Sequence, residues 1–157
     1  MIRKAKISDA RQIVEIVNEF ASEEAMLPRA LNDVYEQLRD FFVSERDNSI
    51  VGCAALHISW EGLGEIRSLA VRKEDQGEGI GRALVQNCLD EAQELEMNRV
   101  FALTYIPDFF RQFGFQQCPK EELPHKIWND CLKCPKFPNC DEIAVILDLG
   151  NGDLKLE

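Results

Sequence analysis

A glycine-rich turn between a strand-like and a helix-like segment constrains this chain more than any other feature. The turn reads Gln76-Gly77-Glu78-Gly79-Ile80-Gly81 and follows the apolar run 63–71. Behind it, apolar residues recur at helical spacing from Ile80 to Leu95. Glycines let a backbone approach a ligand, and the first N–H groups of a helix have no acceptor within the helix. A strand, turn and helix of this kind predict an α/β domain with an anion site at the turn.

The turn is suited to a pyrophosphate, which backbone N–H groups, the helix dipole and a nearby guanidinium would stabilise. The residues that we expect to bind it are Gln76, Gly77, Glu78, Gly79, Ile80, Gly81 and Arg82. A tight strand-to-helix connection without a ligand is the alternative. The pattern is not a dinucleotide fingerprint, which needs G-x-G-x-x-G after the first strand, and it lacks the G-K-[ST] of a P-loop.

The other apolar patterns predict one mixed α/β domain over residues 1–157, with antiparallel pairs early and a parallel crossover around the long helix. Strands are predicted at 2–6, 41–45, 50–58, 63–71, 100–103 and 143–149, and helices at about 10–20, 31–38, 80–95 and 107–113. Ser8-Asp9 offers helix-capping oxygens, and the segment 46–49 predicts a hairpin turn. A loop rich in Cys and Pro is expected at about 118–140.

The charge balance excludes polyanionic partners. Lys and Arg number 18 against 28 Asp and Glu, a formal net charge of -10, which repels nucleic acid and anionic membranes. The N-terminus has no apolar run behind its charges, and no stretch is apolar over the length needed to span a bilayer. We therefore expect a cytoplasmic protein that binds neither nucleic acid nor membranes. Small enzymes are commonly homodimers, so a homodimer is expected here.

The turn and two further motifs resemble those of the GNAT acetyltransferase superfamily. Its pyrophosphate loop reads [QR]-x-x-G-x-[GA], which Gln76, Gly79 and Gly81 match. The strand 65–71 before it and the segment 110–115 after it fall at the order and spacing of that superfamily. The resemblance implies acetyl-CoA as the cosubstrate and a GNAT fold, in which helices flank a central mixed sheet in the order β-α-α-β-β-β-α-β-α-β.

A narrower resemblance, over about residues 17–149, is to the acetyltransferase domain of bacterial N-acetylglutamate synthases. The matching stretches include residues 27–29, 53–56, 64–71, 103–104, 110, 114–115, 123–124 and Asn129. This resemblance implies acetylation of the α-amino group of L-glutamate, the first step of arginine biosynthesis. The long form of that enzyme binds arginine through an amino-acid-kinase-like domain, for which this sequence has no matching segment. We therefore expect a short stand-alone form without that control.

Two other functions compete with this one. The acceptor is alternatively another amine, such as glutamine, another amino acid or a protein N-terminus. A non-catalytic acetyl-CoA-binding or redox-sensing module is the alternative from a different class.

The resemblance also implies catalytic roles. An α-amino group with a pKa of about 8–9.5 is mostly protonated at neutral pH, so a base must remove a proton. Glu65 is the predicted base, acting directly or through a water; without the resemblance it is equally an exposed carboxylate at a strand end. The backbone N–H groups of Leu69, Ala70 and Val71 are predicted to bind the thioester carbonyl and the oxyanion.

The residue that donates a proton to the leaving thiolate does not stand at the position usual in the superfamily. Phe110 belongs to the expected cofactor site, but it stands where many superfamily members have a tyrosine acid, and it cannot donate a proton. Tyr105, at the end of a predicted strand, is the candidate acid for the leaving thiolate. An aromatic lid over the strand end is the alternative for Tyr105.

An acceptor with two carboxylates needs cationic partners, preferably a guanidinium that binds in bidentate fashion. Arg29 is the first candidate, followed by Arg67 and Lys126. Leu27, in the same matching stretch as Arg29, is also expected to contact the acceptor. Solvated surface charge is the alternative for each basic residue.

Four cysteines fall in or near the Cys- and Pro-rich loop. They are Cys118, Cys131, Cys134 and Cys140. A C-x-x-C spacing lets two sulfurs bind one zinc ion, so a structural zinc site is one hypothesis. Free thiols and a redox-sensitive disulfide are the alternatives. Cys53 and Cys88 lie in apolar patterns and are expected in the core.

Overall fold

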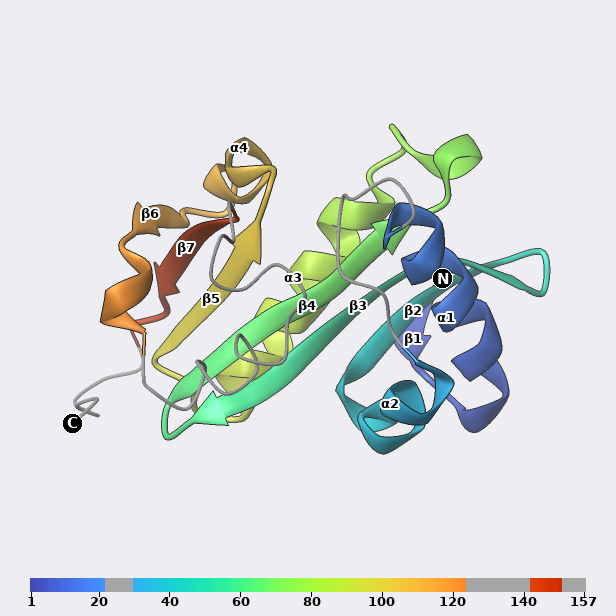
Figure 1. Cartoon of the computed structure of the whole chain (residues 1–157), viewed down its shortest axis with the longest axis horizontal. Coiled ribbons are helices and arrows are strands. Elements are labelled where there is room, and N and C mark those ends of the chain that lie inside the picture. Colours follow the sequence, from blue (N-terminus) through green and yellow to red (C-terminus); the bar gives the residue numbers. More distant parts are fainter. Residues whose placement is uncertain (22–29, 124–141, 151–157) are drawn as a thin grey trace. The chain divides into compact units, whose positions relative to one another are not determined.

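The computed structural model of the chain describes residues 1–21, 30–123 and 142–150. It contains a seven-stranded sheet with the strand order β1-β2-β3-β4-β5-β7-β6 (Figure 1). The strands are β1 (Ile2–Lys4), β2 (Phe41–Arg46), β3 (Ser49–Trp60), β4 (Leu63–Val71), β5 (Arg99–Thr104), β6 (Gln116–Cys118) and β7 (Ile143–Asp148). The α-helices are α1 (Ala10–Ala21), α2 (Leu31–Glu36), α3 (Ile80–Glu94) and α4 (Pro107–Arg111).

The sheet is mixed, as predicted. β1 pairs with β2 and β2 with β3 in antiparallel fashion. β4 and β5 are parallel, with the register running from Leu63↔Arg99 to Glu65↔Phe101, and α3 connects them. The predicted crossover around the long helix is therefore confirmed. β7 is antiparallel to both β5 and β6. The three-residue β6 was not predicted, because Gln116 and Gln117 are exposed and lack the apolar alternation of a strand.

The hairpin predicted between the second and third strands is confirmed. Asp47 and Asn48 both have positive φ, at 53° and 64°, as the two central residues of a type I′ turn require. The strands that they join pair from Arg46↔Ser49 to Phe41↔Ala55.

The predicted helix-capping role is confirmed for Asp9, which forms part of a capping box. A 3-10 turn, Ile7–Asp9, precedes α1, and the Asp9 carboxylate accepts a hydrogen bond from the main-chain N–H of Lys6, with 2.7 Å between N and Oδ2. Arg3 donates to both oxygens of the same carboxylate. Asp9 therefore connects β1 to the start of the helical segment. Residue spacing alone does not reveal its ion pair with Arg3.

The chain forms two compact units. Unit 1 comprises Met1–Leu56 and Ile66–Glu91, and unit 2 comprises His57–Glu65 and Ala92–Glu157. β3 and β4 contribute residues to both units. The single domain expected from the sequence stays a prediction.

In unit 1, helices cover both faces of the sheet (Figure 1). The α1 residues Ile13 and Val17 are fully buried in one core cluster with Cys53 of β3. The neighbouring Gly52 faces Ile80 and Leu84 of α3 instead. Because successive residues of a strand point to opposite faces, α1 and α3 lie on opposite sides of β3. Burial of each large aliphatic side chain contributes about 1.5–3 kcal/mol to stability.

In unit 2, a smaller core forms around β5. Leu63, Phe101, Leu123 and Ala144 are buried together, with Leu103, Cys118 and Ile146 packed against them. α4 contributes aromatic residues on the side of β6 and β7.

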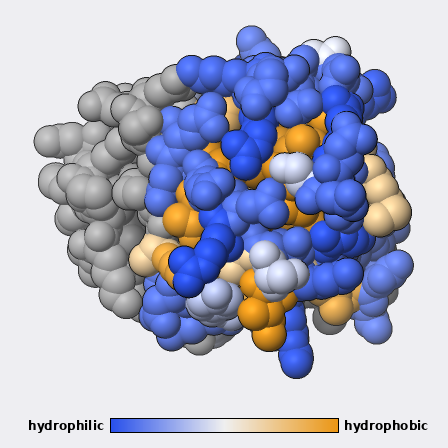
Figure 2. Space-filling view, turned by 90° about the vertical axis from the view of Figure 1, so that its right-hand side faces the viewer, coloured by the Kyte–Doolittle hydropathy of each residue, from blue (hydrophilic) through white to orange (hydrophobic). Residues whose placement is uncertain are grey.

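The exposed surface is mainly polar on the face that Figure 2 presents, where small apolar areas lie between hydrophilic side chains. Within the described parts of the chain, none of the helices is long and apolar enough to cross a membrane.

Candidate active site

The glycine-rich turn has a backbone that only glycine adopts without strain. Gly77 and Gly79 both have a φ of +83°, in the left-handed region that L residues avoid. A Cβ built at either position would meet no atom within 4 Å. Conformation, and not lack of space, therefore requires glycine at both positions. The turn is exposed to solvent and accessible to a ligand.

The turn presents the start of a 15-residue helix. The first intrahelical bond at this end runs from the N–H of Ala83 to the carbonyl of Gly79, at 3.0 Å. The N–H groups of Ile80, Gly81 and Arg82 precede it, so the helix itself supplies them no acceptor. The first turn of α3 contains no acidic residue and carries the exposed Arg82. A cation there opposes the helix dipole, whereas a bound anion would offset both.

Two side chains, those of Gln76 and Arg46, hold the turn in place. The Gln76 amide donates a hydrogen bond to the carbonyl of Val71, with 3.0 Å between Nε2 and O. Arg46, at the end of β2, forms ion pairs with Asp75 at 2.9 Å and with Glu78 at 2.8 Å. The Glu78 carboxylate is thus paired with a cation, which reduces its repulsion of an anionic ligand.

β4 departs from regular strand geometry at its sixth residue. Ser68 has a φ of +54°, which is uncommon for a residue other than glycine, aspartate or asparagine. Leu69 is half-buried, while Ala70 and Val71 are buried. The predicted backbone donors therefore follow directly after an irregular residue. Sequence reasoning missed Ser68 because serine carries no signal for this conformation.

Gly52 on β3 allows α3 to pack closely against the sheet. A Cβ at this position would lie 3.2 Å from Ile80 Cγ2, 3.2 Å from Leu84 Cδ1 and 3.3 Å from the carbonyl oxygen of Ala70. Ile80 belongs to the predicted pyrophosphate site. A glycine inside a predicted strand was the available signal for such a close approach.

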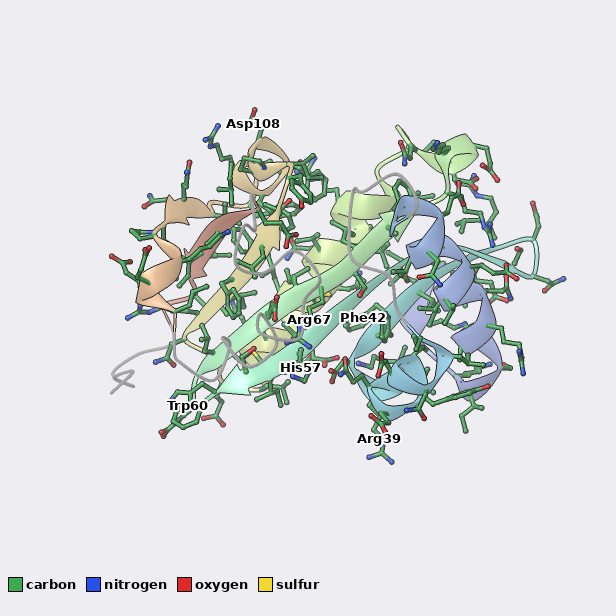
Figure 3. The ribbon with its side chains drawn as sticks, viewed as in Figure 1. Arg39, Phe42, His57, Trp60, Arg67 and Asp108 are labelled. Carbon is green, nitrogen blue, oxygen red and sulfur yellow. The ribbon has the colours of Figure 1, made fainter. Side chains whose placement is uncertain are left out.

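Glu65 lies inside β4, where it is paired in register with Phe101 of β5. Its exposed fraction is 7%, so the alternative of an exposed carboxylate at a strand end is wrong. Carboxylates are rarely buried in proteins unless a partner offsets the loss of hydration. Arg67, labelled in Figure 3, lies two residues further along the same strand. It is half-buried. The base and acceptor-binding roles stay predictions.

The segment after β5 contains the candidate acid. Tyr105 is half-buried directly behind the strand, and the hydroxyl of Thr104 accepts a hydrogen bond from the N–H of Ile106 at 2.9 Å. Phe110 of α4 is buried and packs edge-on against Phe109 and Phe115, with ring centroids 5.3 Å and 5.2 Å apart. These contacts give Phe110 a packing role, and its contact with a cofactor stays a prediction.

Comparison with known proteins agrees with this geometry. Residues 9–115 match the family described as the acetyltransferase (GNAT) family. The chain belongs to this family. Its fold is the GNAT fold, with a mixed seven-stranded sheet flanked by helices.

Two relatives of this GNAT protein are similar over most of their length. An uncharacterised N-acetyltransferase of Chlorobaculum tepidum, CT2212, is 41% identical, over 94% of this chain and 96% of the relative. An amino-acid acetyltransferase of Mycobacterium tuberculosis is 38% identical, over 85% of this chain and 78% of the relative.

Two solved structures are similar in fold and sequence. The Rv2747 protein of Mycobacterium tuberculosis, in complex with CoA and NLQ, has a TM-score of 0.83 at 30% identity, covering 95% of this chain and 99% of that one. N-acetylglutamate synthase of Neisseria gonorrhoeae, complexed with coenzyme A and N-acetyl-glutamate, has a TM-score of 0.87 at 27% identity. That likeness covers 95% of this GNAT protein and 35% of the synthase chain.

Several predicted site residues of the GNAT protein lie outside the described residues. These are Leu27, Arg29, Lys126, Cys131, Cys134 and Cys140. Cys118 is described as a half-buried free thiol whose pKa is raised by burial and by the nearby Glu122. Within residues 1–21, 30–123 and 142–150, no three His, Cys, Asp or Glu side chains are grouped as metal ligands. The zinc hypothesis therefore gains no support and stays a prediction.

Proposed function

We propose that this GNAT protein transfers the acetyl group of acetyl-CoA to the α-amino group of an amino acid, and that L-glutamate is its acceptor. Relatives named amino-acid acetyltransferase support the class of reaction. A synthase complexed with coenzyme A and N-acetyl-glutamate, similar in fold at a TM-score of 0.87, supports the acceptor. The proposed activity is the first step of arginine biosynthesis, and we place it in the cytoplasm.

The observation that carries the proposal is the turn at the head of α3. Gly77 and Gly79 adopt positive φ, the first N–H groups of the helix have no intrahelical acceptor, and Arg82 is exposed beside them. Together they supply donors and positive potential for the diphosphate of acetyl-CoA. Because the chain carries a net charge of -10, a local site of this kind favours a compact anion over a polyanion.

Two features of β4 are assigned to the chemistry. Glu65 takes a proton from the acceptor ammonium, directly or through a water, so that a neutral amine attacks the thioester. The backbone N–H groups that follow Ser68 stabilise the oxyanion. Since Phe110 has no hydroxyl, Tyr105 is the proposed donor of a proton to the departing thiolate. Arg29, Leu27, Arg67 and Lys126 are the proposed contacts of the acceptor.

A panel of acceptors tests the proposal. The purified chain is incubated with acetyl-CoA and one acceptor at a time: L-glutamate, L-glutamine, L-aspartate, L-lysine or a short peptide with a free N-terminus. Mass spectrometry identifies each acetylated product, and loss of the thioester absorbance gives the rate. We expect kcat/KM for L-glutamate to exceed that for every other acceptor by about tenfold or more.

Two results would overturn parts of the proposal separately. A higher kcat/KM for another acceptor would remove glutamate and leave the transferase activity. Tight binding of acetyl-CoA without any acetylated product would favour a non-catalytic sensor.

A further inference from the structure

The irregular residue of β4 needs a partner to hold it. Ser68 has a φ of +54° in the middle of a strand. An L residue in this region is strained, and it persists only where its surroundings fix it. The residues that follow it, Leu69, Ala70 and Val71, provide the backbone donors of the proposed site.

The side chain of Cys53 contacts the main chain on both sides of Leu69. Its thiol donates a hydrogen bond to the carbonyl of Ser68, with 3.4 Å between Sγ and O. The main-chain N–H of Ala70 is oriented toward the same sulfur, where it lowers the pKa of the thiol and opposes the effect of burial. Cys53 is fully buried on β3, the strand next to β4. A thiol is both a weak donor and a weak acceptor, so one side chain serves both peptide groups.

We propose that Cys53 is a positioning residue, whose thiol holds the backbone from Ser68 to Ala70 so that the N–H groups of Leu69 and Val71 bind the thioester carbonyl and the oxyanion. This inference rests on the proposed acetyl transfer.

The thiol keeps its proton over the range in which an enzyme works. Burial raises the pKa of Cys53 to about 12, although the main-chain N–H of Ala70 opposes this shift. The S–H donor toward Ser68 is therefore present at neutral pH. The same burial makes Cys53 unreactive as a nucleophile, which separates a positioning role from a chemical one.

Cys88 is a matched control. It is also fully buried, it lies on α3 in the same unit, and burial raises its pKa to about 12. In the described part of the chain, its thiol has no hydrogen bond of the kind that Cys53 makes to Ser68. Replacement of either cysteine by alanine removes one buried sulfur, but only Cys53→Ala removes contacts to the β4 backbone.

The experiment compares Cys53→Ala, Cys53→Ser and Cys88→Ala. We expect Cys53→Ala to lower kcat by about fivefold to tenfold, as loss of a bond that orients transition-state donors would do. The Kd for CoA, measured by calorimetry, should change by less than about twofold. Cys53→Ser keeps a donor and an acceptor and should recover most of kcat. Cys88→Ala should lower the melting temperature and leave kcat near the wild-type value.

Amide hydrogen exchange gives a second readout that does not need activity. Cys53→Ala should speed exchange at Leu69 and Val71 relative to Cys88→Ala. Equal exchange and equal kcat in the two alanine variants would overturn the positioning role. If the wild-type chain acetylates no acceptor, the proposed function fails, and faster exchange in Cys53→Ala alone would still support the backbone contact.

Discussion

Gln76 connects the glycine-rich turn to the end of β4, because its side-chain amide donates a hydrogen bond to the carbonyl of Val71 across 3.0 Å. The residue is exposed, so the contact contributes little to the core and mainly fixes the path of the turn. Without this contact the turn should sample more conformations, although its glycines are unchanged.

Gln76→Ala should therefore weaken acetyl-CoA binding by about threefold to tenfold, because the hydrogen bond that orients the turn contributes about 0.5–1.5 kcal/mol. Gln86→Ala is the control, since Gln86 is also exposed and donates a hydrogen bond to Asp90 at 3.0 Å within α3. Calorimetric Kd values and urea unfolding compare the two variants. Equal Kd values for acetyl-CoA would show that the contact with Val71 does not shape the site.

Gly52→Ala tests the close approach of α3 to the sheet. The added Cβ would lie 3.2 Å from both Ile80 Cγ2 and Leu84 Cδ1, and overpacking of this kind costs about 1–3 kcal/mol. We expect a lower free energy of unfolding and a higher KM for acetyl-CoA. Leu84→Val removes one of the crowded atoms, so the double variant should lose less stability than the sum of the single changes. Strict additivity would argue against the crowding.

The ion pair between Arg3 and Asp9 predicts sensitivity to acid. Arg3 donates to the two carboxylate oxygens at 2.7 Å and 3.1 Å. The bonds from Arg3 hold the pKa of Asp9 below its ordinary value; burial opposes this shift, and the hydrogen bond from the N–H of Lys6 adds to it. The stabilisation is therefore complete above the unfolded-state pKa of about 3.9, and it is lost as the pH falls through the folded-state pKa.

Asp9→Asn should destabilise the protein by about 1.5–3 kcal/mol at neutral pH. The difference from the wild type should shrink as the pH falls below about 4. Urea unfolding over this pH range measures it. A difference that stays constant with pH would mean that the charge of Asp9 does not contribute.

Glu65→Gln keeps the size of a buried side chain and removes its ability to take a proton. If Glu65 is the general base, kcat should fall by about 10²–10⁴-fold, while the KM for acetyl-CoA stays close to that of the wild type. Glu61→Gln is the control, because Glu61 is an exposed glutamate in the turn before the same strand. Similar kcat values in the two variants would exclude Glu65 as the base.

Features encoded by local periodicity or turn chemistry could be predicted from the sequence. The strand Leu63–Val71 has the predicted bounds, the Asp47-Asn48 turn forms the predicted hairpin, and α3 begins at the predicted Ile80. Each depends on residues close together in the chain. The glycine turn is of this kind as well.

Features that depend on distant partners could not be predicted. The backbone of Ser68 is held by Cys53, and the carboxylate of Asp9 is held by Arg3; neither pairing has a sequence signature. β6 forms by pairing with β7, although its residues alone do not favour a strand. Burial of Glu65 likewise follows from its place in the sheet and not from its neighbours in sequence.

Calorimetric titration of CoA into the protein tests the central claim most directly. Gly79→Ala and Gly150→Ala form a matched pair, since both glycines have positive φ, +83° and +66°, and neither has an atom within 4 Å of an added Cβ. Both changes should cost about 1–2 kcal/mol of stability. The account predicts measurable binding to the wild type and to Gly150→Ala, with a Kd about tenfold higher for Gly79→Ala. Absence of binding to the wild type, or equal Kd values for the two variants, would contradict it.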